Sequence, residues 1–173
     1  MNVEIERKFL VKDDSYKKDV QKFYEISQGY IARDGCNTVR VRIRDNQGFL
    51  TIKGRMTPDG LSRPEWEMEI PYSDAVELLK LCKSGLIQKT RNIIPIGNGL
   101  KWEVDEFKGD NSQLTVAEVE LPSPDTDYPT PAWLGTEVTG VKEFTNSYLS
   151  MHPYNTWRKS SAFIPPSPTT SER

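Results

Sequence analysis

The feature that most constrains the fold of this chain is a charge pattern that repeats at every second residue. Within residues 3–11, Glu4, Glu6 and Lys8 alternate with mainly apolar side chains. Successive side chains of a β-strand point to opposite faces, so this spacing predicts a strand with two carboxylates and an ammonium on one face. Two like charges about 7 Å apart repel by roughly 0.6 kcal/mol in water and about 2.4 kcal/mol at an effective dielectric of 20. The two glutamates therefore favour a nearby cation.

Taken alone, the pattern also fits the solvent-facing side of an ordinary half-buried strand. It recurs, however, in basic segments that are bounded by turn residues. Residues 39–44 alternate Val and Ile with three arginines, and the turn-forming residues 45–48 separate them from the strand-like run 49–53. This arrangement predicts a β-hairpin. The basic residues of these segments and of a later strand-like run are Arg40, Arg42, Arg44, Lys53, Lys89 and Arg91.

Acidic segments follow the same period, and each carries a single sign of charge. Adjacent like charges on one face of a sheet are unfavourable, so a merely solvated face usually mixes charges with neutral polar residues. The pattern therefore predicts strands closed into a barrel, with a basic wall and an acidic wall facing a wet interior. Cross-strand salt bridges on an exposed sheet are the structural alternative. The acidic residues are Glu65, Glu67, Glu69, Glu103, Asp105, Glu118 and Glu120.

Such an interior suits a polyanion and its metals. Arginine offers paired donors to phosphate oxygens, lysine offers a point charge, and carboxylates bind the hard cations that accompany phosphate. The chain has one histidine, His152, and no G-x-x-x-x-G-K-[ST] motif. A single histidine disfavours Ser-His-Asp or Cys-His catalysis. The lack of the motif predicts that side chains, rather than a glycine-rich loop, hold the phosphates.

Composition places these segments in one domain. The 173 residues include no Pro/Gly/Ser-rich linker that would divide them, and residues 165–173 form a polar, proline-rich end. A formal net charge of −2 argues against a general nucleic-acid binder, which needs a surplus of Lys and Arg. No apolar run approaches the roughly 20 residues of a membrane span. We therefore expect a cytoplasmic protein with no membrane or nucleic-acid partner. Helices are expected only around residues 15–24, 74–82 and 144–151.

The order and spacing of these segments resemble the CYTH domain family, the triphosphate tunnel metalloenzymes, across nearly the whole chain. The resemblance implies a mainly β (α+β) fold: a closed antiparallel eight-stranded tunnel barrel with a few flanking helices. The domain would span residues 1–155, and residues 156–173 would form a tail. One departure is Phe144, where the family often has tyrosine. The matching segments are Glu4–Val11, Gln28–Tyr30, Val39–Arg42, Thr51–Gly54, Arg63–Glu67, Lys89–Arg91, Trp102–Phe107, Ala117–Glu120 and Trp133–Thr139.

The resemblance implies that the basic side of the tunnel binds a triphosphate and the acidic side binds Mg²⁺ or Mn²⁺. With the charge pattern, it predicts a metal-dependent phosphohydrolase acting on a linear triphosphate, inorganic tripolyphosphate above all. The phosphate-binding residues would be Lys8, Arg40, Arg42, Lys53, Lys89 and Arg91. The metal ligands would be Glu4, Glu6, Glu118 and Glu120, with Glu65, Glu67 and Asp105 supporting them or holding a second metal. Lys8, Arg42 and Glu118 would be the catalytic residues.

Three alternatives stay open at the level of sequence. A class IV-type adenylate cyclase and a thiamine triphosphatase use the same tunnel and differ in what grips the organic group. A polyphosphate-binding module without turnover needs mainly the basic wall, so the complete acidic set argues against it. Phosphate release with and without Mg²⁺ separates these functions. The partner is expected to be a small-molecule triphosphate, and the sequence leaves the oligomeric state open, a homodimer included.

Overall fold

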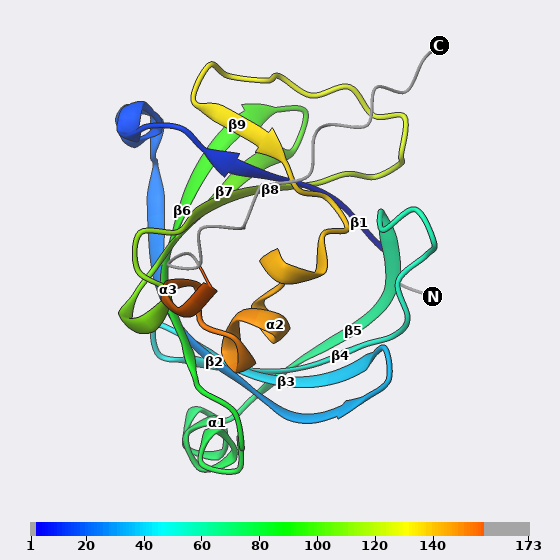
Figure 1. Ribbon diagram of the computed structural model, residues 1–173, viewed down its shortest axis with the longest axis vertical. Helices are drawn as coiled ribbons and strands as arrows, with labels where there is room; N and C mark the ends of the chain where they lie inside the picture. The colour runs from blue at the N-terminus through cyan, green and yellow to red at the C-terminus, as the bar shows by residue number, and fades with distance from the viewer. Residues whose placement is uncertain (1–2, 158–173) are drawn as a thin grey trace.

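Strands dominate the computed structural model, which describes residues 3–157 (Figure 1). The strands are β1 (Val3–Val11), β2 (Lys22–Asp34), β3 (Asn37–Arg44), β4 (Gln47–Lys53), β5 (Ser62–Ile70), β6 (Ile87–Gly97), β7 (Leu100–Phe107), β8 (Thr115–Glu120) and β9 (Leu134–Glu137). The α-helices are α1 (Tyr72–Leu79), α2 (Asn146–Met151) and α3 (Tyr154–Trp157), and the 3-10 helices are η1 (Asp14–Asp19), η2 (Gly109–Asn111) and η3 (Lys142–Phe144). None of the helices within the described residues is long and apolar enough to cross a bilayer.

The strands pair antiparallel and close into a ring. Their order is β5-β4-β3-β2-β6-β7-β8-β1, and the start of β1 pairs with the start of β5 to complete the barrel of eight. β9 is an additional strand that pairs with the end of β1. The predicted closed antiparallel eight-stranded barrel is therefore confirmed. The predicted tail lies, from residue 158 onward, outside the described residues.

The edge of β1 between β5 and β9 lacks a continuous neighbouring strand, and two loops supply its hydrogen bonds. The backbone N–H of Glu6 donates to the carbonyl of Leu61 at 3.1 Å. The backbone N–H of Lys8 donates to the Thr139 hydroxyl at 2.9 Å. A buried N–H without a partner would cost free energy, so these contacts stabilise the strand that carries three of the predicted site residues.

The same two loops touch through a pair of glycines. Gly60 and Gly140 both have φ of +71°, and a Cβ built on Gly60 would lie 2.6 Å from the Cα of Gly140. A left-handed conformation costs a non-glycine residue about 1–2 kcal/mol, and a clash with rigid backbone adds about 1–3 kcal/mol.

We expect the substitution Gly60→Ala to lower the free energy of unfolding by about 2–5 kcal/mol, measured by urea denaturation. Gly99→Ala is the matched control, because Gly99 has φ of +75° but no atom within 4 Å of the point where an added Cβ would lie. It should lose only the roughly 1–2 kcal/mol of the left-handed conformation. Equal losses in the two variants would contradict the contact between the loops.

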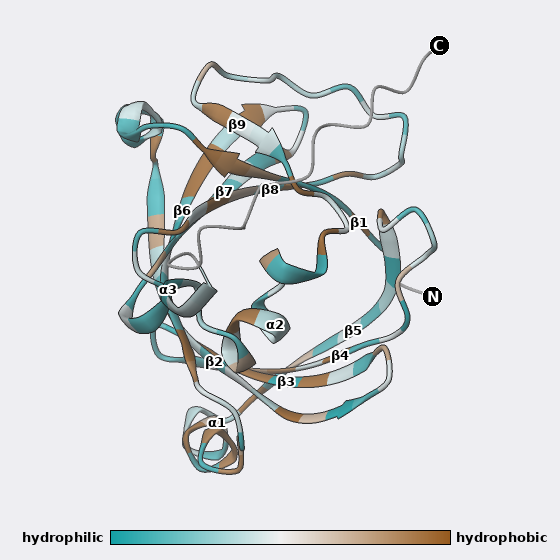
Figure 2. Cartoon of the chain, viewed as in Figure 1, coloured by the Kyte–Doolittle hydropathy of each residue, from teal (hydrophilic) through white to brown (hydrophobic). Residues whose placement is uncertain are grey.

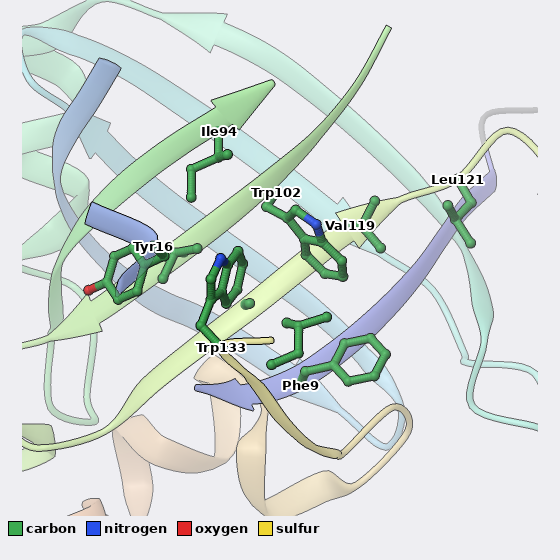
Figure 3. Close-up of a cluster of buried hydrophobic side chains, with 10 residues drawn as sticks. Phe9, Tyr16, Ile94, Trp102, Val119, Leu121 and Trp133 are labelled. Carbon is green, nitrogen blue, oxygen red and sulfur yellow. The ribbon is translucent and has the colours of Figure 1, made fainter. Parts of the chain in front are cut away.

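The main apolar core lies outside the barrel wall. Outward-facing residues of β1, β6, β7 and β8 pack beneath η1 and the long segment between β8 and β9 (Figure 1). Trp102 is fully buried at its centre, with ring centroids 5.7 Å from Phe9 and 5.8 Å from Trp133 (Figure 3). Burial of such aromatic side chains stabilises this half of the barrel, which carries the acidic strands β7 and β8.

A second apolar cluster fills one end of the barrel interior. Ile87, Phe107 and Val116 lie on the inward face of their strands, next along the two-residue period to Lys89, Asp105 and Glu118. Phe144 and Leu149 pack on them, and α2 lies inside the ring of strands in Figure 1. Brown and teal segments alternate along the strands in Figure 2, as the period requires. The interior is thus apolar at the end that holds α2 and charged beyond it.

Two of the three predicted helices are present as α1 and α2. The helix expected over residues 15–24 is wrong beyond Asp19, where η1 ends. Phe23 and Tyr24 instead belong to β2 and pair with Asn92 and Arg91 of β6. Aromatic residues have high strand propensity, and pairing with an inward-facing charged strand overrides the helical spacing.

Candidate active site

The charged part of the barrel interior encloses a cavity of about 1050 Å³. All eight strands of the barrel contribute to its wall, and the first residues of α2 line it as well. Because alternate residues of each strand face inward, the cavity receives the charged rows and the outer core receives the apolar rows. The predicted residues that line it are Glu4, Glu6, Lys8, Arg40, Arg42, Lys53, Glu65, Glu67, Arg91, Glu118 and Glu120.

Lys89 and Asp105 are the two predicted residues that do not line the cavity. Both lie in the wall behind it, and the Lys89 ammonium, fully buried, donates to Asp105 Oδ2 at 2.5 Å and to Asn146 Oδ1 at 3.1 Å. Asp105 also accepts two hydrogen bonds from Arg91, from Nε and Nη2, each at 2.7 Å. Asp105 therefore fixes the orientation of Arg91, and Lys89 connects this support to α2.

Lys8 and Glu118 form the central ion pair of the cavity, with Nζ and Oε1 separated by 3.0 Å. Burial alone would lower the pKa of Lys8, but Glu118 and Glu6 together hold it well above its ordinary value. Burial would likewise raise the pKa of Glu118, and Lys8 and Arg91 hold it well below its ordinary value. Both groups are therefore charged at neutral pH.

The β4–β5 side of the cavity holds three further ion pairs, two of them made by Lys53. Lys53 Nζ lies 2.6 Å from Glu4 Oε2 and 3.2 Å from Glu65 Oε2. Arg40 Nη2 lies 3.3 Å from Glu67 Oε2. Burial opposes the charge of Glu67, but a hydrogen bond from Thr51 and the nearby guanidinium groups lower its pKa.

Arg42 differs from these cations. Its Nε donates to the amide oxygen of Gln28 at 3.0 Å, and no carboxylate among residues 3–157 lies within ion-pair distance of it. Burial, together with repulsion from Arg40 and Arg91, lowers the pKa of Arg42 to about 9. The cavity thus contains a concentration of positive charge that a bound anion would stabilise.

The opposite excess occurs among the carboxylates. Burial and the charges of Glu118 and Glu4 raise the pKa of Glu6 in spite of Lys8. Burial, Glu4 and Glu103 raise the pKa of Glu120. This repulsion and the hard oxygen donors fit a divalent cation in chemistry and in charge. Within residues 3–157 no three acidic, histidine or cysteine side chains already converge on a metal-sized site.

Four charged residues that line the cavity are outside the predicted set: Arg44, Arg63, Lys101 and Glu103. Arg44 follows Arg40 and Arg42 along β3, and its guanidinium lies 4.8 Å from the ring centroid of Tyr24. Arg63 lies with its Nε 3.9 Å from Glu4 Oε2, and Glu103 forms an ion pair with Arg91. Arg44, Arg63 and Glu103 each lie two residues from a predicted site residue on the same strand. The two-residue period therefore also predicts that their side chains face inward.

Comparisons with known proteins agree with this geometry. The model of the CYTH domain family matches residues 2–150. An inorganic triphosphatase of Acetivibrio thermocellus is 43% identical over 160 residues, which cover 92% of this chain and 100% of that protein. An inorganic triphosphatase of Nitrosomonas europaea is 32% identical over 152 residues, covering 86% and 97% of the two chains. A crystal structure of an inorganic triphosphatase matches with a TM-score of 0.61 and 30% identity, again over 86% and 97%.

Proposed function

The chain belongs to the CYTH domain family, and we propose on this basis that it is an inorganic triphosphatase that hydrolyses tripolyphosphate with the help of a divalent cation. The observation that carries the proposal is the pair of opposed charge excesses in one cavity. On one side, Arg42 has no carboxylate of the described residues within ion-pair distance, and burial and its basic neighbours outweigh the more distant Glu67 and Asp105. On the other side, Glu6 and Glu120 are repelled by neighbouring carboxylates. A polyanion together with a cation would relieve both at once.

In this proposal the cavity cations hold the phosphate chain. Lys8, Arg40, Arg42, Lys53 and Arg91 contact phosphate oxygens and stabilise the charge that develops on them in the transition state. Glu67, Gln28 and Asp105 hold the side chains of Arg40, Arg42 and Arg91 in place, which lowers the entropy lost when substrate binds. Lys89 contributes from behind, through the contact with Asp105 that orients Arg91.

The carboxylates Glu4, Glu6, Glu118 and Glu120 would hold Mg²⁺ or Mn²⁺, with Glu65 and Glu67 supporting them. The cation supplies Lewis-acid neutralisation of phosphate oxygens when it is bound. In the reaction, a water oxygen forms a bond to a terminal phosphorus, and the bond between that phosphorus and the bridging oxygen breaks. The bridging oxygen leaves with the other two phosphates, and a proton of the water passes to solvent. The products are orthophosphate and pyrophosphate. Lys8 and Arg42 neutralise the charge that moves onto the leaving oxygen.

The alternatives predict different products from the same cavity. A cyclase would release pyrophosphate from ATP, and a thiamine triphosphatase would need a site for the organic group. Two relatives with 43% and 32% identity are inorganic triphosphatases, which supports hydrolysis of the inorganic substrate. A binding module without turnover would gain nothing from the mutually repelling carboxylates Glu6 and Glu120.

A substrate panel tests the proposal. We expect kcat/KM with Mg²⁺ or Mn²⁺ to fall from tripolyphosphate to ATP and from ATP to pyrophosphate. Pyrophosphate fills only part of the row of cations and loses several charge-assisted contacts, each contributing about 1.5–3 kcal/mol. Phosphate release and cyclic AMP should be measured in the same reactions. Cyclic AMP formation from ATP at a rate comparable to tripolyphosphate hydrolysis would overturn the hydrolase assignment.

A further inference from the structure

Gln28 lies in the barrel wall directly behind Arg42. The two residues are register partners in the pairing of β2 with β3, and Gln28 is fully buried. Its Oε1 accepts the hydrogen bond from Arg42 Nε at 3.0 Å. Arginine has only donors, so the amide must present its oxygen to the guanidinium and turn its NH₂ group away. This contact fixes the orientation of both side chains.

The contact contrasts with those of the other cations that we propose to contact phosphate. Lys8 is paired with Glu118 at 3.0 Å, and Lys53 with Glu4 at 2.6 Å. Arg40 and Arg91 likewise have carboxylate partners, Glu67 and Asp105. Among the described cations that we propose as phosphate ligands, Arg42 is held by a neutral amide, whereas the other four are paired with carboxylates. A glutamate at position 28 would have nearly the same shape and could accept the same hydrogen bond.

We propose that Gln28 is a positioning residue that orients Arg42 without neutralising it, so that the full charge of Arg42 is kept for a phosphate group of the substrate. The inference rests on the proposed function and deepens it by naming what sets the affinity of that cavity for a polyanion. Lys8 and Lys53 must first be separated from Glu118 and Glu4 before their full charge is available to the substrate. Arg42 needs no such exchange.

Two further observations support this role. The Gln28 NH₂ group is buried without a hydrogen-bond partner among the described residues. A buried unpaired amide costs folding free energy, so packing alone does not account for its presence. Burial and the charges of Arg40 and Arg91 lower the pKa of Arg42, so a bound anion beside it would stabilise its charged form.

The test compares Gln28→Glu with Gln28→Met, by calorimetric titration with inorganic tripolyphosphate in the absence of divalent metal. Gln28→Glu should weaken binding by roughly 10- to 100-fold, the loss of one charge-assisted contact. Gln28→Met keeps the charge of Arg42 and removes only the orienting contact, so it should weaken binding by only about 3-fold. Wild-type affinity in Gln28→Glu, or equal losses in the two variants, would overturn the inference.

A second measurement applies even if Gln28→Glu does not fold. The double variant Gln28→Met/Arg42→Met replaces both polar partners by apolar groups and removes the repulsion from Arg40 and Arg91. It should unfold at a higher temperature than the wild type without ligand, and tripolyphosphate should raise its unfolding temperature by less than it raises that of the wild type. A lower unfolding temperature for the double variant would overturn the inference.

The titration measures binding rather than turnover, which separates the two proposals. A wild-type protein that binds tripolyphosphate, loses this affinity in Gln28→Glu and releases no phosphate with any divalent metal would contradict the proposed function alone. An active enzyme whose affinity is unchanged in Gln28→Glu would contradict the inference alone.

Discussion

Replacing Glu118 by Gln is expected to lower kcat for tripolyphosphate by roughly 100-fold or more. The substitution keeps the size of the side chain and removes the charge that pairs with Lys8 at 3.0 Å and faces Arg91 at 3.5 Å. Glu118 is also one of the proposed metal ligands, so a higher concentration of Mn²⁺ should restore part of the activity. Steady-state phosphate release over a range of metal concentrations measures both effects.

The matched control for Glu118→Gln is Glu69→Gln. Glu69 continues the two-residue period of Glu65 and Glu67 on β5, but it is exposed and does not line the cavity. Its substitution should leave kcat and KM near the wild-type values. A Glu118→Gln enzyme that turned over normally without added metal would show that this carboxylate is not part of the reaction site.

Replacing Arg91 by Met is expected to lower the free energy of unfolding by about 3–5 kcal/mol, because removal of one partner leaves buried carboxylates without compensation. Arg91 donates two hydrogen bonds to Asp105 at 2.7 Å and pairs with Glu103, and its side chain is 11% exposed. The substitution also removes a proposed phosphate ligand, so tripolyphosphate hydrolysis should be lost. Urea denaturation at pH 7 measures the first effect.

The stability loss of Arg91→Met should depend on pH. In the wild type, burial opposes the charge of Asp105, but Arg91 and Lys89 lower its pKa below 3.8. This pairing therefore contributes stability above that pH and loses it as the pH falls further. In the variant, Asp105 lacks the positive charge of Arg91, so its pKa should be higher than in the wild type. Protonation of Asp105 at low pH then removes the unpaired buried charge that destabilises the variant. The difference between the two proteins should shrink as the pH falls toward and below 3.8.

Arg7→Met is the control for this substitution. Arg7 pairs on the outside of the barrel with Glu137 at 3.1 Å, and both side chains are about one third exposed, at 33% and 35%. Exposed pairs contribute about 0–1 kcal/mol, so the variant should stay near wild-type stability. A loss in Arg91→Met no larger than that in Arg7→Met would contradict the structural role of the buried cluster.

The barrel could be predicted from sequence because charge marks the inward face of most of its strands. The period that assigns Arg40 and Arg42 to the interior extends without change to Arg44, and the same holds for Glu103 beside Asp105. β2 carries no such charge pattern, and the spacing of the aromatic residues at its start predicts a helix instead. Strand identity is therefore predictable where charge alternates and is lost where it does not.

The depth of a residue along the barrel could not be predicted. Lys89 and Arg91 share one face of β6, yet Arg91 lines the cavity and Lys89 is buried behind Asn146 of α2. The difference depends on where α2 enters the ring and on how the strands are staggered. Both follow from packing between segments far apart in the sequence, which a local period does not encode. For the same reason, the sequence does not predict that Gln28 is the hydrogen-bond partner of Arg42.

The ion pairs of the cavity have a thermodynamic consequence. Lys8 is bound to Glu118 and Lys53 to Glu4, so a triphosphate that attracts the lysines sets the carboxylates free. A divalent cation that attracts the carboxylates sets the lysines free in the same way. By linkage, each ligand must raise the affinity for the other by the same factor. The arrangement therefore favours the fully loaded and the empty barrel over either half-loaded state.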